Sequence, residues 1–374
     1  MESILLPDVS VTIHRDNQPS VPATDIETGW PGLHLYPFRK SADWSPDVAR
    51  TWFERWQAMS LPCSGCKSDW SRWVEKHPPD FRSPRRFFSW GVRAHNAVNT
   101  RLNVDNSHPT MPLARATALW SSIASAGPVA WYTPVTEQPI TPGSNRLVIT
   151  IATGPCRSVL DRSRPIMQAY ADRCAADYIE LTNDTQSWWG LEKFRVAHFA
   201  RQYEETLFLD CDVLPFGRDL FQYVRDVLGS PDVAMHDDYP CLKQFENTDW
   251  IHPERALTMQ CVGEESTYEN ICLNSGVVYT RREAADVWAP PKLPIPTSHC
   301  AEQFLVEWNL HAMMSRPDRN IRFAPLPTEF NMQWWMNYDH SITSADFVHC
   351  ANAPDRPREL DRVLQIRVAS SCAT

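Results

Sequence analysis

The pattern of apolar and polar residues divides the chain into a helical amino-terminal part and a carboxy-terminal part in which strands and helices alternate. Apolar runs within 146–154, 177–181 and 204–210 are typical of buried strands, and the stretches between them carry apolar residues at helical spacing. Strands that alternate with helices predict an open, mostly parallel α/β sheet, in which ligands bind beyond the carboxyl ends of the strands.

The amino-terminal part has a different pattern. Within residues 29–103 the Trp, Phe and Val positions favour helices over strands. The polar segment before them predicts an extended arm, and five Pro or Gly residues within 128–144 predict a linker. We therefore expect four parts, namely a polar arm at 1–28, a small all-α helical domain at 29–125, a Pro-rich linker at 126–144 and an α/β domain at 145–374.

Composition narrows the class of protein. The 374 residues suffice for two domains, and sixteen Trp with 43% hydrophobic and 22% charged residues indicate a compact globular protein. No apolar run has the length of a membrane span, and no secretion signal is recognisable, so we expect an intracellular, cytoplasmic protein without a membrane partner. Eleven cysteines, mostly scattered singly, then indicate reduced thiols rather than a disulfide framework.

Two carboxylates end the most informative of the predicted strands. Asp210 and Asp212 follow the apolar run 207–209, and their i, i+2 spacing places both side chains on one side of the strand. Hard oxygen ligands of this kind suit Mg2+ or Mn2+, which takes the rest of its shell from water and substrate phosphates. The alternative is an ordinary Asp-rich turn, because Asp-x-Asp also occurs often by chance.

With the motifs around it, this pair resembles the nucleotide-sugar glycosyltransferases of the GT-A fold, over roughly residues 145–355. The resemblance is strongest to the retaining, glycogenin-like and galactosyltransferase-like branch. It is carried, in chain order, by the strand 147–153, Lys193, Asp210-Cys211-Asp212, Asn274-Ser275-Gly276-Val277, Glu302-Gln303, Phe330-Asn331 and Phe347-Val348-His349. It implies a metal-dependent hexosyltransferase that moves a sugar from a nucleoside diphosphate sugar, first of all a UDP-sugar, to an acceptor hydroxyl.

The resemblance also implies roles for individual residues. A divalent cation and a nearby Lys or Arg would stabilise the negative charge of the departing diphosphate. The implied metal ligands are Asp210, Asp212 and His349. The implied catalytic residues are Asp212, Asn274, Glu302 and Gln303. The implied contacts to the donor are Thr150, Ala152, Thr153, Lys193, Asp210, Asp237, Gly276 and Arg356.

For several of these residues a purely structural role is the alternative to the implied functional one. A histidine after an apolar run, like His349, is often structural, and residues 274–278 also suit a tight turn. Glu302 would be favoured at any helix start by the helix dipole, and Asp237 also suits a solvated turn. Arg356 departs from the family pattern, which places Gly and then Lys-Pro-Trp after the late histidine, so phosphate contact from this loop depends on the arginine.

A second resemblance covers about 75 residues of the helical part. Cys63-x-x-Cys66 suits a redox dithiol or half a zinc site, and the absence of a second close cysteine pair favours redox chemistry. Together with the run 95–102, this pair resembles the flavin-linked Erv/Alr sulfhydryl oxidases, although Asn103-Val104-Asp105 replaces the family's Lys-Pro and no separate shuttle pair is visible. The implied FAD contacts are Trp30, His34, Cys63, Cys66, His95, Asn96 and Asn99.

The resemblance to Erv/Alr proteins leaves a second function open, a thiol oxidase whose GT-A-like domain serves as a binding scaffold.

For the glycosyltransferase, the distribution of charge along the chain suggests a class of acceptor. Residues 55–115 carry ten Lys or Arg against four acids in a chain of net charge −9, and aromatic residues are interleaved with them. Such a surface could bind DNA with a hydroxymethylated base, extruded into the pocket. A solvated helical face is the alternative, and a protein or glycan acceptor also stays open.

Overall fold

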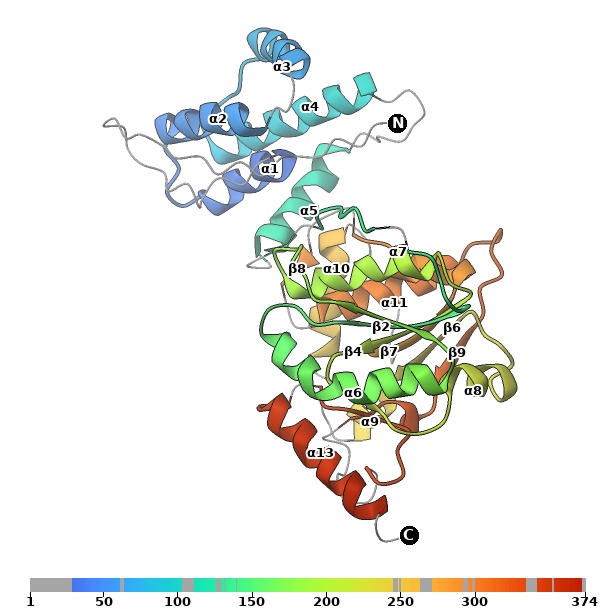
Figure 1. Cartoon of the computed structure of the whole chain (residues 1–374). Coiled ribbons are helices and arrows are strands. Elements are labelled where there is room, and N and C mark those ends of the chain that lie inside the picture. The colour runs from blue at the N-terminus through green and yellow to red at the C-terminus, as the bar shows by residue number, and fades with distance from the viewer. Residues whose placement is uncertain are drawn as a thin grey trace. The chain divides into compact units, whose positions relative to one another are not determined.

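The computed structural model divides into two compact units, Met1–Ala126 and Gly127–Thr374 (Figure 1). It describes residues 29–60, 64–102, 111–125, 129–130, 132–138, 140–244, 248, 250–262, 271–291, 295–297, 300–333, 342–351 and 353–371. The arm predicted at 1–28 lies outside these residues, and the predicted domain and linker bounds stay predictions.

The first unit is helical, as its sequence pattern predicts. Its helices are α1 (Gly29–Arg39), α2 (Pro46–Ser60), α3 (Ser64–Lys76), α4 (Pro84–Leu102) and α5 (Leu113–Ser125). The core is built largely of aromatic rings in stacked and edge-on contact, such as the stacked pair Tyr36 and Trp52 with centroids 4.0 Å apart. The indole N–H of the buried Trp90 donates to the carbonyl of His77 at 2.7 Å, which removes the cost of burying this polar atom.

A six-stranded sheet forms the centre of the second unit, in the order β3-β2-β4-β7-β6-β9. The strands are β2 (Arg146–Ile151), β3 (Asp177–Leu181), β4 (Glu205–Asp210), β6 (Val233–Asp237), β7 (Leu273–Arg281) and β9 (Phe323–Leu326). Only β7 runs against the others, because it pairs antiparallel with both of its neighbours. The predicted fold class, a mostly parallel α/β sheet preceded by a helical region, is confirmed.

The sheet is buried on both faces, which explains the continuous apolar runs in its strands. Alternate residues enter two cores: Leu207 and Leu209 lie in one, and Phe208 lies in the other. Figure 1 shows the helices that cover the two faces. Helices α6 (Arg157–Arg173), α8 (Leu220–Asp226) and α13 (Arg356–Ser371) contribute to the first core, and α7 (Val196–Ala200) and α11 (Ala301–Met314) contribute to the second.

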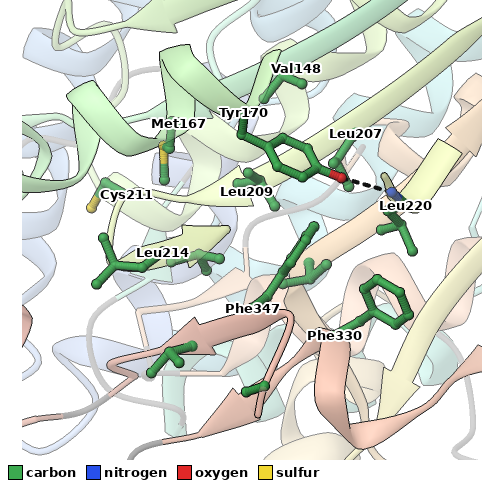
Figure 2. Packing of buried hydrophobic residues seen from close by; sticks show 14 of the residues in the cluster. Val148, Met167, Tyr170, Leu207, Leu209, Cys211, Leu214, Leu220, Phe330 and Phe347 are labelled. Atoms are coloured by element: carbon green, nitrogen blue, oxygen red, sulfur yellow. Dashed lines mark hydrogen bonds between the residues drawn. The ribbon is translucent and has the colours of Figure 1, made fainter. Parts of the chain in front are cut away.

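A hydrogen-bonded tyrosine hydroxyl lies within the first core. The Tyr170 hydroxyl accepts a hydrogen bond from the backbone N–H of Leu220 at 2.8 Å, and its ring packs edge-on against Phe347 (Figure 2). The hydrogen bond links the start of α8 to α6. The ring contact packs α6 against the strand that carries Phe347.

That strand belongs to a small second sheet that decides the geometry of the site. Its strands are β5 (Val213–Pro215), β10 (Met332–Gln333) and β11 (Phe347–His349), in the order β10-β11-β5. The antiparallel register pairs His349 with Val213. Because Val213 directly follows Asp212, this pairing brings the late histidine beside the carboxylates at the end of β4.

The remaining described elements include the two strands β1 and β8, which pair with each other. They are β1 (Val129–Ala130), β8 (Ile295–Pro296), α9 (Tyr239–Gln244), α10 (Ile251–Val262) and the 3-10 helices η2 (Gly154–Cys156), η3 (Trp189–Arg195), η4 (Arg282–Trp288) and η5 (Thr328–Phe330). In the part of the chain that the structure covers, every helix is too short or too polar to cross a membrane.

Candidate functional site

The three predicted metal ligands lie together. Asp210 ends β4, Asp212 follows it, and His349 ends β11. Each residue offers one ligand atom, and these atoms all lie within 4.8 Å of one another. His349 Nε2 is 3.3 Å from an oxygen of Asp212 and 3.8 Å from an oxygen of Asp210. Two carboxylates and one imidazole at this spacing form a donor set that suits a divalent cation such as Mn2+ or Mg2+.

The imidazole of His349 is held in place from two sides. Its Nδ1 lies 2.9 Å from Asn331 Oδ1, and because an amide oxygen only accepts, Nδ1 donates to this amide while Nε2 faces the two carboxylates. On the other side the ring lies against Gly276, where an added Cβ would be 2.2 Å from His349 Cε1. The ligand nitrogen is therefore oriented before any cation binds.

Removing this orienting amide should weaken metal binding without removing a ligand. We expect Asn331→Ala to lower the affinity for Mn2+ by roughly 10- to 100-fold, the usual effect of losing a partner behind a metal-bound histidine. Electron paramagnetic resonance of free Mn2+ measures this affinity. Asn309→Ala is the matched control, since Asn309 is a buried asparagine on α11 whose side-chain amide donates to the backbone carbonyls of Val287 and Ala289. An equal loss of affinity in both variants would contradict the orienting role.

Lys193 lies directly behind the metal ligands. Its ammonium is buried, 3.0 Å from Asp210 Oδ1, 3.0 Å from Ser275 Oγ and 3.4 Å from Glu302 Oε1. Burial alone would lower the pKa of Lys193, but the carboxylates of Asp210 and Glu302 outweigh burial and raise this pKa above its ordinary value. The site therefore contains a permanent buried cation next to the carboxylates.

Arg356 contributes a second cation, from the first residue of α13. Its Nε lies 3.2 Å from Asp212 Oδ2. Burial works against ionisation of Asp212, but His349 and Arg356 together lower the pKa of Asp212 to about 2. The carboxylate is therefore ionised at neutral pH, as a metal ligand must be.

Glu302 and Gln303 lie in the first turn of α11, where Glu302 faces Lys193. Glu302 is 3% exposed, and its Oε2 has no hydrogen-bond partner among the residues that the structure describes. Burial raises the pKa of Glu302 above its ordinary value. The amide of Gln303 donates to Cys272 Sγ at 3.4 Å. A buried carboxylate oxygen without a partner is costly unless a ligand completes it.

Asn274 belongs to a polar cluster that the sequence did not reveal. Its amide donates to Asp238 Oδ2 at 2.8 Å, and the amide of Gln333 donates to the same oxygen at 2.6 Å. His236 Nδ1 lies 2.8 Å from the other oxygen of Asp238. Asp237, which the sequence favoured, uses one oxygen to accept from the backbone N–H groups of Cys272 and Tyr239, at 2.9 and 3.0 Å.

The proposed donor contacts on β2 lie at the carboxyl end of this strand. Ile151 pairs with Asp210, so Thr150, Ala152 and Thr153 reach the same edge of the sheet as the metal ligands. All three are buried, and Ala152 packs in the first core. Thr150 Oγ1 has no hydrogen-bond partner in the described part of the chain. Their contact with a donor stays a prediction.

In the first unit, the residues implied to contact FAD are engaged with the protein itself. His34 Nε2 bonds to His95 Nδ1 at 2.9 Å, and Trp120 from α5 packs 4.9 Å from the His34 ring. Burial lowers the pKa of His34 well below its ordinary value and that of His95 to about 4, so both rings are neutral at pH 7. The side-chain amide of Asn96 donates to and accepts from the backbone of Met111.

The other members of this implied set fall outside what the structure describes. These are Cys63 and the side chains of Trp30, Cys66 and Asn99. The described cysteines elsewhere are free thiols, and most of them are buried.

Comparison with known proteins adds two findings. The model of the Erv1 / Alr family matches residues 28–116. A comparison with curated proteins gave no match.

Solved structures similar to this chain include three glycosyltransferases. One is involved in the glycosylation of the major capsid of PBCV-1, with 14% identity and a TM-score of 0.41 over 59% of this chain and 98% of that chain. Bifunctional WbbM has 10% identity and a TM-score of 0.41 over 61% and 50%. Galactosyltransferase LgtC, bound to donor and acceptor sugar analogs, has 10% identity and a TM-score of 0.35 over 60% and 95%.

With TM-scores below 0.5, these similarities do not establish the chemistry, which rests on the strands and side chains described above. The chain has a helical region that matches the Erv1 / Alr family and an α/β unit, and glycosyltransferases are among the solved structures similar to the chain.

Proposed function

We propose that the protein is a metal-dependent glycosyltransferase that takes its sugar from a nucleoside diphosphate sugar. The observation that carries the proposal is the cluster of Asp210, Asp212 and His349, with the buried ammonium of Lys193 beside it. Ordinary Asp-rich turns do not have a histidine oriented toward them by a buried amide. Nor do they have a buried lysine behind them, so a purely structural explanation of the Asp-x-Asp pair is disfavoured.

The donor set fits a resident Mn2+ or Mg2+, held by Asp210, Asp212 and His349. When bound, this cation would neutralise the charge that develops on the departing diphosphate. Lys193 adds a fixed positive charge in a water-poor environment, where such a charge stabilises an anion more strongly than in water. Arg356, half-buried at the start of α13, is the group we assign to the phosphates in place of the family's lysine.

We assign the sugar side of the site to Glu302, Gln303 and Asn274. These residues are buried and lie on α11 and β7: Glu302 is beside Lys193, Asn274 donates to Asp238, and Gln303 donates to Cys272. The unpartnered oxygen of Glu302 is the group best placed to accept a hydrogen bond from a sugar hydroxyl. A UDP-sugar is the donor we propose, with transfer under retention, as the resemblance implies.

For the acceptor we propose DNA that carries a hydroxymethylated base. Support comes from the basic excess of the helical unit, in which Arg85 and Arg93 are exposed on α4. Arg82 and Arg86 in the same region are already paired with Asp80, so the surface available to phosphates is smaller than the count of basic residues suggests.

A panel of nucleoside diphosphate sugars tests the proposal on the full-length protein. We expect one donor to release its nucleoside diphosphate in the presence of Mn2+, and chelation by EDTA to abolish this release. Labelled sugar should then appear on hydroxymethylated DNA and not on the unmodified duplex. Absence of both Mn2+ binding and nucleotide binding would refute the transferase, whereas donor hydrolysis without labelled DNA would refute only the acceptor.

The family match over 28–116 favours a thiol oxidase as the second candidate. The described residues do not fit a flavin as the resemblance implies, because His34 is 1% exposed and the amide of Asn96 is bonded to Met111. We therefore derive no redox step from this unit. The absorbance spectrum of the purified protein decides between the candidates, since a bound flavin gives a visible band that the transferase does not require.

A further inference from the structure

A buried ion pair lies next to the start of the strand that carries Asn274. Arg255 on α10 and Glu307 on α11 have side chains that are each 2% exposed, and Arg255 Nη2 lies 3.0 Å from Glu307 Oε1. A buried ion pair is weak evidence for stability, because removing two charges from water costs about as much as their attraction returns. The other groups that these two side chains bond indicate what the pair does.

Both side chains also bond to the backbone at the start of β7. Arg255 Nη2 donates to the carbonyl of Ile271, and Glu307 Oε2 accepts from the backbone N–H of Leu273 at 3.1 Å. Leu273 is the first residue of β7 and directly precedes Asn274. The ion pair therefore fixes the backbone immediately before this asparagine.

Two aspartates hold the same backbone segment from the end of β6. Asp237 Oδ1 accepts from the backbone N–H of Cys272 at 2.9 Å, and the backbone N–H of Asp238 donates to the carbonyl of Cys272 at 2.8 Å. The side-chain amide of Asn274 then donates to Asp238 Oδ2 at 2.8 Å. Residues 271–273 are thus bonded to the ion pair and to the two aspartates, and the position of the Asn274 side chain depends on both.

Apolar contacts hold the two helices together independently of the charges. Ile251 and Met259 of α10 lie in one buried cluster with Phe304 of α11 and with Cys272. The guanidinium of Arg255 lies over the ring of Phe304, 5.1 Å from its centroid. The apolar side chains can pack α10 against α11, but they cannot bond the polar backbone groups of residues 271 and 273. The charged pair supplies these bonds.

We propose that Arg255 and Glu307 are positioning residues that hold Asn274 in place for the sugar of the donor. The inference rests on the proposed function, in which Asn274 lies on the sugar side of the site, and it adds two residues that act through the backbone of 271–273. The metal ligands lie on other strands, at the end of β4 and on β11. Loss of the ion pair should therefore affect the sugar side and leave the cation site intact.

Arg255→Met in the full-length protein tests the inference. Burial raises the pKa of Glu307 to about 7, against the opposing effect of Arg255. Without Arg255 this carboxyl can take up a proton instead of remaining an unpaired buried charge, so we expect the variant to fold. Hydrogen exchange measured by mass spectrometry should be at least about 5-fold faster in a peptide that covers 271–277, because a buried carbonyl has lost its donor. Exchange in a peptide that covers 205–210 should not change.

The kinetic measurement separates positioning from a general loss of structure. With the panel of nucleoside diphosphate sugars, kcat for release of the nucleoside diphosphate should fall by about 10- to 100-fold, the scale of a misplacement of about 1 Å. The affinity for Mn2+, and the affinity for UDP in the presence of Mn2+, should not change. A purely structural ion pair would instead lower stability and leave kcat of the folded protein as it is.

Arg146→Met is the matched control, because Arg146 makes the same kinds of contact at the opposite edge of the sheet. Its Nε bonds to Glu205 Oε2 at 3.2 Å, and its Nη1 donates to the carbonyl of Cys174 at 2.9 Å. Arg146 is the first residue of β2, whereas the metal ligands lie beyond the carboxyl ends of the strands. This variant should keep both kcat and the exchange rate of 271–277.

Three outcomes would overturn the inference. The first is an unchanged exchange rate of 271–277 in Arg255→Met, and the second is faster exchange with an unchanged kcat. The third is a wild-type protein that releases no nucleoside diphosphate from any donor, which removes the proposed function as well, whereas the first two leave the proposed function standing. If Arg255→Met does not fold, Arg255→Lys, which keeps the charge on a shorter side chain, is measured in the same two ways.

Discussion

Asp212→Asn is expected to lower the Mn2+-dependent release of nucleoside diphosphate by at least about 100-fold, the scale on which loss of one electrostatic group in a site reduces turnover. The change keeps the size of the side chain but removes the charge that faces His349 and Arg356. An amide is a much weaker ligand for a hard cation than a carboxylate. The affinity for Mn2+ should fall in parallel, which electron paramagnetic resonance measures without any turnover.

A carboxylate of similar burial elsewhere in the sheet provides the control. Asp232 is 8% exposed, directly precedes β6, and accepts from the backbone N–H of Arg322 at 2.9 Å. It lies at the amino end of its strand, opposite the edge that carries the metal ligands. Asp232→Asn should cost about 1–3 kcal/mol of stability and leave Mn2+ affinity unchanged. Full Mn2+ affinity in Asp212→Asn would remove the basis of the proposed function.

The metal ligands illustrate how far the sequence could predict the site. Asp210 and Asp212 were predictable from physical pattern, because an apolar strand followed by two carboxylates at i, i+2 spacing places them at a ligand-binding edge. Nothing local to His349 indicates a ligand, and its position depends on the pairing of β11 with β5, whose paired residues lie 132 to 136 positions apart in the sequence. His349 was predicted as a metal ligand only from the order of motifs that the chain shares with GT-A glycosyltransferases.

The residues around the ligands were harder to predict. The resemblance implied Asp237 as a donor contact, and in the structure a register irregularity between Met235 and Asp237 in the pairing of β6 with β7 breaks the alternation along the strand. Asp238 therefore joins Asn274 and Gln333 in the polar cluster. A bulge of this kind has no reliable sequence signal. The alternation of side chains along a strand therefore does not predict which way the residues at the end of β6 face.

In the first unit the helices were predictable from the sequence, but the contacts of the motif residues were not. Its helices follow from the spacing of apolar residues, and a known family matches it. The sequence motif nevertheless did not indicate that His34 and His95 bond to each other, since this depends on the packing of α1 against α4 and on Trp120 from α5. A motif fixes which residues are present, and the packing decides whether they face a cofactor.

Gly276→Ala is expected to lower Mn2+ affinity by about 100-fold, although Gly276 binds no metal. The resemblance implied Gly276 as a contact to the donor, and in the structure this glycine makes room for the His349 ring. The added Cβ would lie 2.2 Å from His349 Cε1 and 2.9 Å from its Nδ1, so the ring must move. A displacement of about 1 Å of a positioned group costs on the order of 100-fold. Overpacking should also cost about 1–3 kcal/mol of stability in urea denaturation.

A double-mutant cycle separates the clash between the added Cβ and the His349 ring from a general destabilisation of β7. In a His349→Ala background the ring is gone, so adding Gly276→Ala should cost much less stability than it does in the wild-type protein. Gly91→Ala is the control for the substitution itself, since a Cβ there would make only an ordinary 3.4 Å contact with Leu33. Gly91→Ala should leave Mn2+ affinity unchanged. An equal stability cost of Gly276→Ala in both backgrounds would show that the His349 ring does not pack against residue 276, and the preorganised histidine would then have to be abandoned.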